Sequence, residues 1–467
     1  MELSDDTIYG AILIFSIIFG VFIKSVKGLE QKKYLSSSVG LVTILLICRI
    51  HTIHSVVTVV GSCVILKLTS FRWCHVVMFV WCFGYLAFFR TVHWFGLPMP
   101  NPLSNAVQLL LTLRMVGLAF EIHDSRKMEQ DHDNSEKTDR VLIQKYVHIK
   151  PSDSDIVCYA YCYIGILTGP YYKYRTYYDW LDNSATDQIA TWRPFLSKVK
   201  PVPVVIFCFY FVTRFFSIQY VDTNDFAHEP FWFRLFYMVP MFIMFRTRLY
   251  SAWILSECMS ITAALGAYPI KSKPKCGTGP TDLQALDDIK TQSSDKTVEY
   301  DFETVHNLNI YGCELAPTTR EGLRSWNMTV QYWLAANVHH RIPKSLKAFR
   351  VLITMSVSAF WHGIHPGYYL SFLTVPPILM AEEAMTNAFR KGASEKQQKL
   401  FDFGCWFFKM RGFDYMCMGF LLLSYKSTIK YWMSIYFLGH IVIVMFLIIG
   451  NAARYLWPKR TKLDKKD

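Results

Sequence analysis

Long apolar runs repeat along almost the whole chain and strongly limit what it can fold into. A helix needs about twenty largely apolar residues to cross a bilayer. The runs predict an all-α polytopic membrane protein with roughly ten to twelve transmembrane or re-entrant helices, because several runs are short. They cover residues 8–23, 35–48, 53–68, 73–89, 103–120, 156–170, 202–220, 231–245, 253–268, 348–361, 368–380, 413–425 and 431–452.

The composition also indicates a membrane-embedded chain. Of the 467 residues, 52% are hydrophobic and 18% are charged, whereas soluble proteins carry about 25% charged residues. Disorder, collagen and small disulfide scaffolds are excluded by this balance. The formal net charge is +13, and the basic residues lie mostly between apolar runs and in the tail 457–467. We expect that tail to be cytosolic, and the absence of a nucleic-acid motif argues against nucleic-acid binding.

The sequence predicts one membrane-embedded domain spanning residues 1–467. Residues 123–154 and 270–320 are polar enough to leave the membrane, and we expect both to be loops. No internal repeat is visible, which counts against a transporter built from two related halves.

His362 is the strongest candidate for chemistry. It lies in the segment SAFWHGIHPGYY, within an otherwise apolar run, and ionisable residues inside membranes are costly and usually functional. Imidazole is also the side chain that titrates naturally near neutral pH. In a helix, Ser358 would share its face, and Pro366 should end the helix just after His365. The alternative is a structural histidine bonded to a carbonyl.

Asn327 is the second candidate, in the amphipathic and aromatic segment RSWNMTVQYWLAAN. Asn327 and Gln331 are four residues apart and would share a helix face, next to a stripe that includes Trp326 and Trp333. The alternative is an amide that only packs helices together. The histidine pairs lack a third ligand at suitable spacing, so we expect no metal site.

The blocks WNMTVQYWL and SAFWHGIHPGYYLSF together resemble the membrane-bound O-acyltransferase family. That family has an Asn or Asp in an amphipathic segment and, some tens of residues later, a His in an apolar one, which match Asn327 and His362. Further blocks resemble its lysophosphatidylinositol acyltransferase branch: LTGPYYKYRTYYDWL (167–181), YDFETVHNLNIYG (300–312), HPGYYLSFLTVPP (365–377) and KMRGFDYMCMGFLLLS (409–424).

The resemblance implies a multi-pass enzyme of the endoplasmic reticulum with helices around a central catalytic chamber. It would transfer a polyunsaturated, arachidonoyl-type chain from acyl-CoA, as co-substrate, to the sn-2 hydroxyl of lysophosphatidylinositol, without a further cofactor. His362 can act as general base, because an alcohol is a poor nucleophile until it loses its proton. Asn327 can orient a substrate or donate to the developing oxyanion.

Several further residues are candidates for substrate binding. CoA is polyanionic, so its phosphates should meet basic residues, and Ser358, Trp361 and Trp333 could line the acyl path. The basic candidates are Arg341, Lys344, Lys347, Lys173 and Arg175; each could instead be an interfacial anchor. Trp326 and Gln331 complete the candidate set.

Other functions remain open at this point. They are transfer to another lysophospholipid, a sterol or a protein; transport through the membrane; or scaffolding without catalysis.

Overall fold

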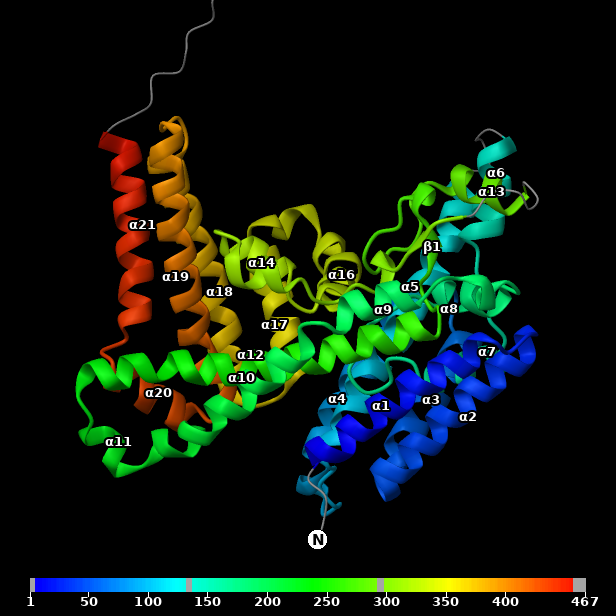
Figure 1. Cartoon of the computed structure of the whole chain (residues 1–467), viewed down its shortest axis with the longest axis horizontal. Helices are drawn as coiled ribbons and strands as arrows, with labels where there is room; N and C mark the ends of the chain where they lie inside the picture. Colours follow the sequence, from blue (N-terminus) through cyan, green and yellow to red (C-terminus); the bar gives the residue numbers. More distant parts are fainter. Residues whose placement is uncertain (1–4, 132–136, 292–297, 457–467) are drawn as a thin grey trace, which may run out of the picture. The chain divides into compact units, whose positions relative to one another are not determined.

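The computed structural model describes residues 5–131, 137–291 and 298–456 (Figure 1). The tail 457–467 lies outside the described residues. The backbone divides into two compact units, the first formed by Met1–Pro203, Tyr250–Leu308 and Asn327–Arg341, and the second by Val204–Leu249, Asn309–Trp326 and Ile342–Asp467. Both are built from helices, which confirms the predicted all-α class.

The first unit contains most of the N-terminal helices and, within the described residues, the single strand pair of the chain. The strands β1 (Tyr268–Pro269) and β2 (Tyr300–Asp301) are antiparallel. The helices are α1 (Asp5–Lys24), α2 (Leu29–Cys48), α3 (Thr52–Leu68), α4 (Cys74–Thr91), α5 (Pro102–Asp131), α6 (Lys137–Tyr146), α7 (Asp153–Tyr161), α8 (Tyr174–Asp182), α9 (Trp192–Val199), α13 (Leu283–Thr291) and α16 (Met328–Asn337).

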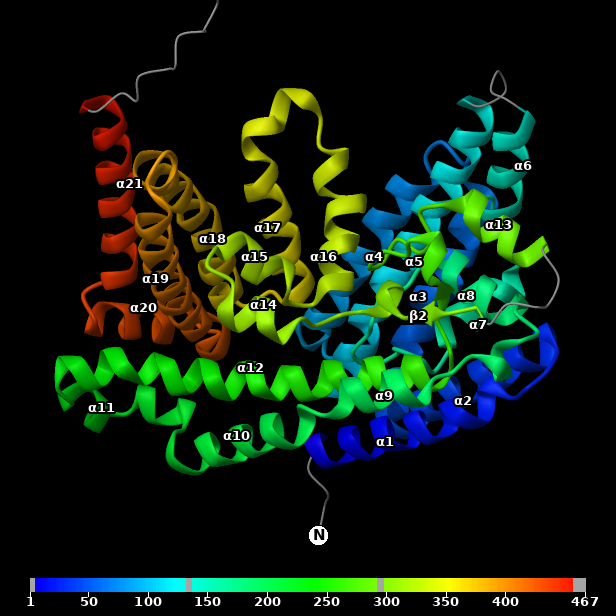
Figure 2. The ribbon, with the colours of Figure 1, turned by 45° about the horizontal axis from the view of Figure 1, so that its top comes forward.

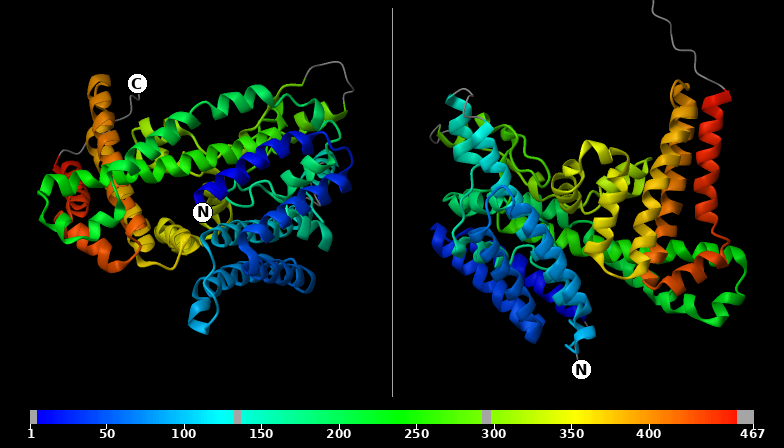
Figure 3. Two further views of the ribbon diagram at one scale, coloured as in Figure 1. Left: turned by 60° about the horizontal axis from the view of Figure 1, so that its bottom comes forward. Right: turned by 180° about the vertical axis from the view of Figure 1, so that it is seen from behind.

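The second unit contains α11 (Asn224–His228), α14 (Ile310–Leu315), α15 (Thr319–Arg324), α17 (Arg350–His362), α18 (Pro366–Met385), α19 (Glu395–Leu422), α20 (Tyr425–Ser434) and α21 (Leu438–Leu456). It also takes nearly all of α10 (Val202–Phe215) and the first part of α12 (Phe231–Thr262). The helices α18, α19 and α21 stand side by side in Figures 1 and 2, and the right-hand view of Figure 3 shows them from behind.

The helix α5 is the core of the first unit. Every side chain from Leu110 to Phe120 is buried, and a helix that is buried all round must be enclosed by other elements. Its neighbours include α2, α3, α4, α7, α8 and α16. One of the enclosed residues is Arg114, which is 1% exposed.

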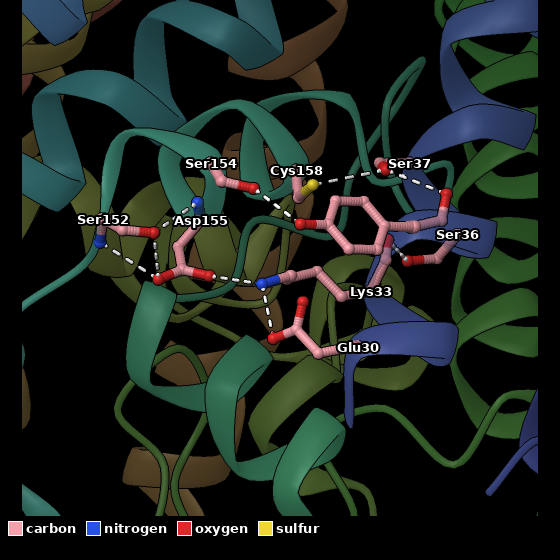
Figure 4. A network of polar contacts seen from close by, with 9 residues as sticks. Glu30, Lys33, Ser36, Ser37, Ser152, Ser154, Asp155 and Cys158 are labelled. Atoms are coloured by element: carbon pink, nitrogen blue, oxygen red, sulfur yellow. Dashed lines mark hydrogen bonds and ion pairs between the residues drawn. The ribbon is translucent and has the colours of Figure 1, made fainter. Parts of the chain in front are cut away.

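A charged network joins α2 to α7 in the same unit (Figure 4). The Lys33 ammonium lies 2.8 Å from Glu30 Oε1 and 2.9 Å from Asp155 Oδ1. Ser152 forms a capping box with Asp155 at the start of α7. The Lys33 side chain is buried and that of Asp155 is half-buried, so removing Asp155 would take a charged partner from a buried ammonium, and the network fixes α7 against α2.

Within the described residues, six helical stretches are long and apolar enough to cross a membrane. This supports a multi-pass membrane protein. The ten to twelve transmembrane or re-entrant helices predicted from the sequence also include shorter or more polar helices, such as the 13-residue α17. The six stretches are Asp6–Lys24, Leu29–Leu68, Cys74–Phe95, Pro102–Asp131, Trp192–Asp222 and Leu438–Leu456.

Four local expectations differ from the structure. The described residues of 123–154 are largely helical rather than a loop, because α5 continues to Asp131 and α6 covers Lys137–Tyr146. The described residues of 270–320 include β2, α13, α14, the start of α15 and two short 3-10 helices. The runs 231–245 and 253–268 belong largely to one helix, α12, since neither Gly nor Pro interrupts the polar residues between them.

The run 156–170 is not a single span. Helix α7 ends at Tyr161, and an irregular buried chain follows. Gly165 and Gly169 take positive φ values of 73° and 88° there, which glycine adopts without a steric penalty.

Candidate active site

Asn327 takes an unusual backbone conformation at the start of α16. It lies in the left-handed region, with φ 47° and ψ 53°, directly before the first helical residue. Asparagine tolerates this region better than most residues because its short polar side chain can bond locally. Its carbonyl accepts the N–H groups of Val330 and Gln331 at 3.0 Å each. Its Oδ1 atom is buried, and no described residue donates a hydrogen bond to it, so the amide oxygen is available for a further bond.

Asn307 holds the chain directly after Asn327. Its carbonyl accepts the Met328 N–H at 2.8 Å. Its Oδ1 accepts the Thr329 N–H at 3.1 Å and the Thr329 hydroxyl at 2.6 Å. The Thr329 oxygen in turn accepts the Tyr171 N–H at 3.0 Å. Asn307 and Thr329 are fully buried, so a broken bond here leaves an unsatisfied group.

A buried carboxylate supports the loop that carries Asn307. Glu257 is 1% exposed, and its Oε1 accepts the Leu308 N–H at 2.9 Å. Its Oε2 lies 2.5 Å from the Lys198 ammonium. Sequence reasoning missed Glu257, although it is a lone carboxylate within an apolar run, and that signal alone could have identified it.

His306 lies in the same loop and bonds to two acceptors. Its Nδ1 is 3.0 Å from Glu303 Oε2, and its Nε2 is 2.9 Å from the Leu308 carbonyl oxygen. Both ring nitrogens can donate at once only in the imidazolium form. Burial lowers the pKa of His306, but the Glu303 hydrogen bond and the nearby Glu257 carboxylate together raise it more, so the pKa lies above its usual value.

Two other candidates on α16 differ in exposure. Trp333 is fully buried and its Nε1 donates to the Leu113 carbonyl at 3.0 Å. Gln331 is half-buried. Trp333 therefore anchors α16 to α5, and its predicted place along the acyl path stays a prediction.

Arg114 organises the irregular chain that follows α7, and sequence reasoning missed it too. Its Nη1 donates to the carbonyls of Tyr159, Ala160 and Cys162 at 3.1, 2.9 and 3.0 Å. Its Nη2 donates to the Tyr172 hydroxyl at 2.9 Å. Irregular backbone inside a membrane protein needs such internal partners, because lipid offers none. Arg114 is the single basic residue in the apolar run 103–120, so it could have been identified in the same way as Glu257, as a lone charged residue within an apolar run.

Lys173 and Arg175 follow this irregular chain at the start of α8. The Tyr174 and Arg175 N–H groups donate to the two Glu121 carboxylate oxygens at 2.8 and 3.1 Å. Arg175 forms an ion pair with Asp179 at 2.7 Å. The Lys173 ammonium lies 5.4 Å from the centre of the Tyr332 ring, so both predicted CoA ligands already have protein partners.

The electrostatic surroundings of Lys173 favour its charged form. Burial lowers the pKa of its ammonium, but Tyr332 and Glu121 raise it more, so the pKa lies above its usual value. Lys173 is therefore a fixed positive charge in the first unit.

The remaining basic candidates follow α16 in the sequence. Arg341 forms an ion pair with Asp124 and donates through Nε to the Ala336 carbonyl at 3.1 Å. Lys344 and Lys347, in the second unit, are exposed. No group of three or more His, Cys, Asp or Glu side chains that could hold a metal ion occurs within the part of the chain that the structure describes.

His362 is the last residue of α17 and is surrounded by aromatic rings. Ring centres lie 4.7 Å away for Trp361, 5.1 Å for Phe420 and 5.2 Å for Phe372. Tyr368 follows at 6.1 Å. The half-buried imidazole is therefore packed among aromatic rings.

The helix around His362 ends earlier than predicted. Helix α17 stops at His362 rather than after His365, because the chain turns extended at Gly363, with φ 174°. Pro366 begins α18 instead of ending α17, a position where its missing N–H costs nothing. Ser358 and Trp361 are both buried in α17.

A chain of aromatic rings leads from His362 to Trp326 within the second unit. Phe420 lies 5.2 Å from Phe245, and Phe245 lies 6.3 Å from Trp326, between ring centres. Sequence reasoning placed Trp326 on one stripe with Trp333, but Trp326 belongs to the second unit and Trp333 to the first.

The model of the membrane-bound O-acyltransferase family matches residues 58–425. The chain is 41% identical to the membrane-bound acylglycerophosphatidylinositol O-acyltransferase mboat7 of Xenopus laevis, over 99% of this chain and 97% of that protein. The human protein of that name, MBOAT7, is 40% identical over 98% and 96%, and the Drosophila melanogaster protein frj is 33% identical over 94% and 90%. The chain belongs to the membrane-bound O-acyltransferase family.

Proposed function

We propose that this protein transfers an acyl chain to lysophosphatidylinositol. The observation that carries the proposal is the 41% identity, over nearly the full length of both chains, with a relative named as an acylglycerophosphatidylinositol O-acyltransferase. Acyl-CoA is the proposed donor, and the proposed chain is polyunsaturated and of the arachidonoyl type. The proposed location is the endoplasmic reticulum membrane.

His362 is the proposed general base. Its imidazole takes the proton of the lysolipid sn-2 hydroxyl as that oxygen attacks the thioester carbonyl carbon. The carbon–sulfur bond then breaks, and the CoA thiolate takes up a proton to leave as free thiol. An imidazole suits this role, because a histidine titrates near neutral pH and a general base must be neutral before it acts. The reaction balances without a metal or a further cofactor.

Asn327 is proposed to bind through its amide. Its buried Oδ1 lacks a donor among the described residues, which supports a hydrogen bond from a substrate hydroxyl, and its amide N–H can stabilise an oxyanion. The left-handed backbone supports a functional role, since strained conformations concentrate at such sites.

The test uses purified full-length protein with arachidonoyl-CoA and a panel of lysophospholipids, and follows release of free thiol. We expect release with lysophosphatidylinositol and a drop of about 10²–10⁴-fold in His362→Ala. His365→Ala is the matched control, because His365 is exposed and three residues away, and it should stay near wild type. Release with a different lysolipid would reject the acceptor, and an active His362→Ala would reject the base.

A further inference from the structure

A cavity of about 570 Å³ lies within the second unit, away from α17. One face each of α12, α18, α19 and α21 forms its wall. On α19 the lining residues include Phe401, Cys405, Phe408, Gly412 and Tyr415, and this spacing of three or four places them on one helix face. His362 and its ring neighbours are not among the described residues that line it. Ligand sites commonly measure about 300–1,000 Å³.

Two glycines on α19 create much of this space. A Cβ atom added at Gly404 would meet no heavy atom within 4 Å, and one added at Gly412 would meet only Ile378 Cδ1, at 3.6 Å. Glycine inside a helix costs about 1 kcal/mol relative to alanine, and neither glycine has a positive φ that would require it. Larger side chains would therefore fit at both positions, and the two glycines leave this part of the cavity unfilled.

The charged groups of the wall are already bound within the protein. The Lys409 ammonium donates to the Cys313 and Ala316 carbonyls at 2.9 and 2.7 Å. Arg411 pairs with Asp414 at 2.6 Å. Glu382, also in the wall, accepts the Thr319 N–H at 2.7 Å. These groups are thus engaged within the protein, and the rest of the lining is mainly apolar and aromatic, which favours an apolar occupant.

Helix α21 connects the cavity to the bilayer. It is long and apolar enough to span a membrane. Leu438, Val442 and Phe446 line the cavity, while Val444 and Ile448 are more than half exposed. One side of α21 therefore lines the cavity, and its other side presents exposed apolar residues of the kind that contact lipid. Membrane lipid is thus the apolar ligand nearest to the cavity.

We propose that this cavity binds the hydrocarbon chain of a membrane phospholipid, at a site separate from the residues around His362. The inference does not depend on the proposed acyl transfer.

The test uses the full-length protein in phosphatidylcholine vesicles that contain a small fraction of phosphatidylcholine with a diazirine at the end of one acyl chain. After irradiation, mass spectrometry maps the labelled peptides. We expect labels on the lining faces of residues 401–415 and 438–446. Gly404→Phe should reduce them at least fivefold, since its ring fills the cavity, and Gly412→Leu serves as a second filler if that variant does not fold.

The matched control is Gly84→Phe on α4, where an added Cβ also meets nothing within 4 Å; it should label as wild type does. Labelling confined to outward residues such as Val444 and Ile448 would overturn the proposal. Unchanged labelling in both folded fillers would overturn it too, as would labelling by a diazirine fatty acid but not by the phospholipid.

Discussion

Asn327 and His362 are held in opposite ways. The chain around Asn327 is fixed by directional hydrogen bonds from Asn307 and Thr329, with a buried carboxylate behind them. His362 lies among aromatic rings, whose packing is less directional. Hydrogen bonds fix the position of an atom, whereas ring packing holds a side chain through its shape. We therefore expect substitutions in the two regions to differ in their effects.

Within the hydrogen-bonded region, the largest effect should come from removing the side-chain amide of Asn327. We expect Asn327→Ala and Asn327→Gly each to lower kcat by about 10²-fold, because both remove the amide. Thermal unfolding should distinguish them, since alanine adds about 1–2 kcal/mol of left-handed strain that glycine avoids. Asn337→Ala, at the other end of α16, is the control. If Asn327→Gly turns over like wild type, the residue serves only the backbone.

The next effect tests the hydrogen bonds that place Asn327. Thr329→Val keeps the side-chain shape and removes the hydroxyl that joins Asn307 to Tyr171. We expect it to lower the free energy of unfolding by about 1–3 kcal/mol, because the buried Tyr171 N–H is left unsatisfied. Thr329→Ser keeps the hydroxyl and should lose less. A loss in Thr329→Ser but none in Thr329→Val, measured by thermal or denaturant unfolding, would show that the methyl group matters and the hydroxyl does not.

A smaller effect should follow from the rings around His362. Phe420→Leu keeps the site apolar but removes one ring contact, and such contacts contribute about 0.5–1.5 kcal/mol. We expect a fall of about two- to tenfold in kcat, with KM for the lysolipid little changed. Phe403→Leu on the same helix is the control, because Phe403 is 63% exposed. A change confined to KM would mean that Phe420 contacts substrate rather than the base.

The sequence predicted some of this arrangement and not the rest, for physical reasons. Periodic apolar runs predicted the helical membrane class, and a lone histidine in such a run pointed to His362. The same reasoning applied to Arg114 and Glu257 would have found two supports of the fold. Asn307 carried no comparable signal, because it is a polar residue in a polar stretch and its role depends on contacts with residues 328 and 329.

The smallest effect concerns pH and should appear only in the hydrogen-bonded region. Burial lowers the pKa of His306 in the folded state, but the Glu303 hydrogen bond and the Glu257 carboxylate together raise it above its usual value. The stabilisation is therefore complete below the ordinary histidine pKa of about 6.5 and is lost as pH rises through the higher folded value. We expect the wild-type melting temperature to fall over this interval, and His306→Gln and Glu303→Gln to flatten the profile. His365→Gln should leave the profile unchanged. An unaltered slope in His306→Gln would mean that other groups set the pH dependence, and that the two regions do not differ in this respect.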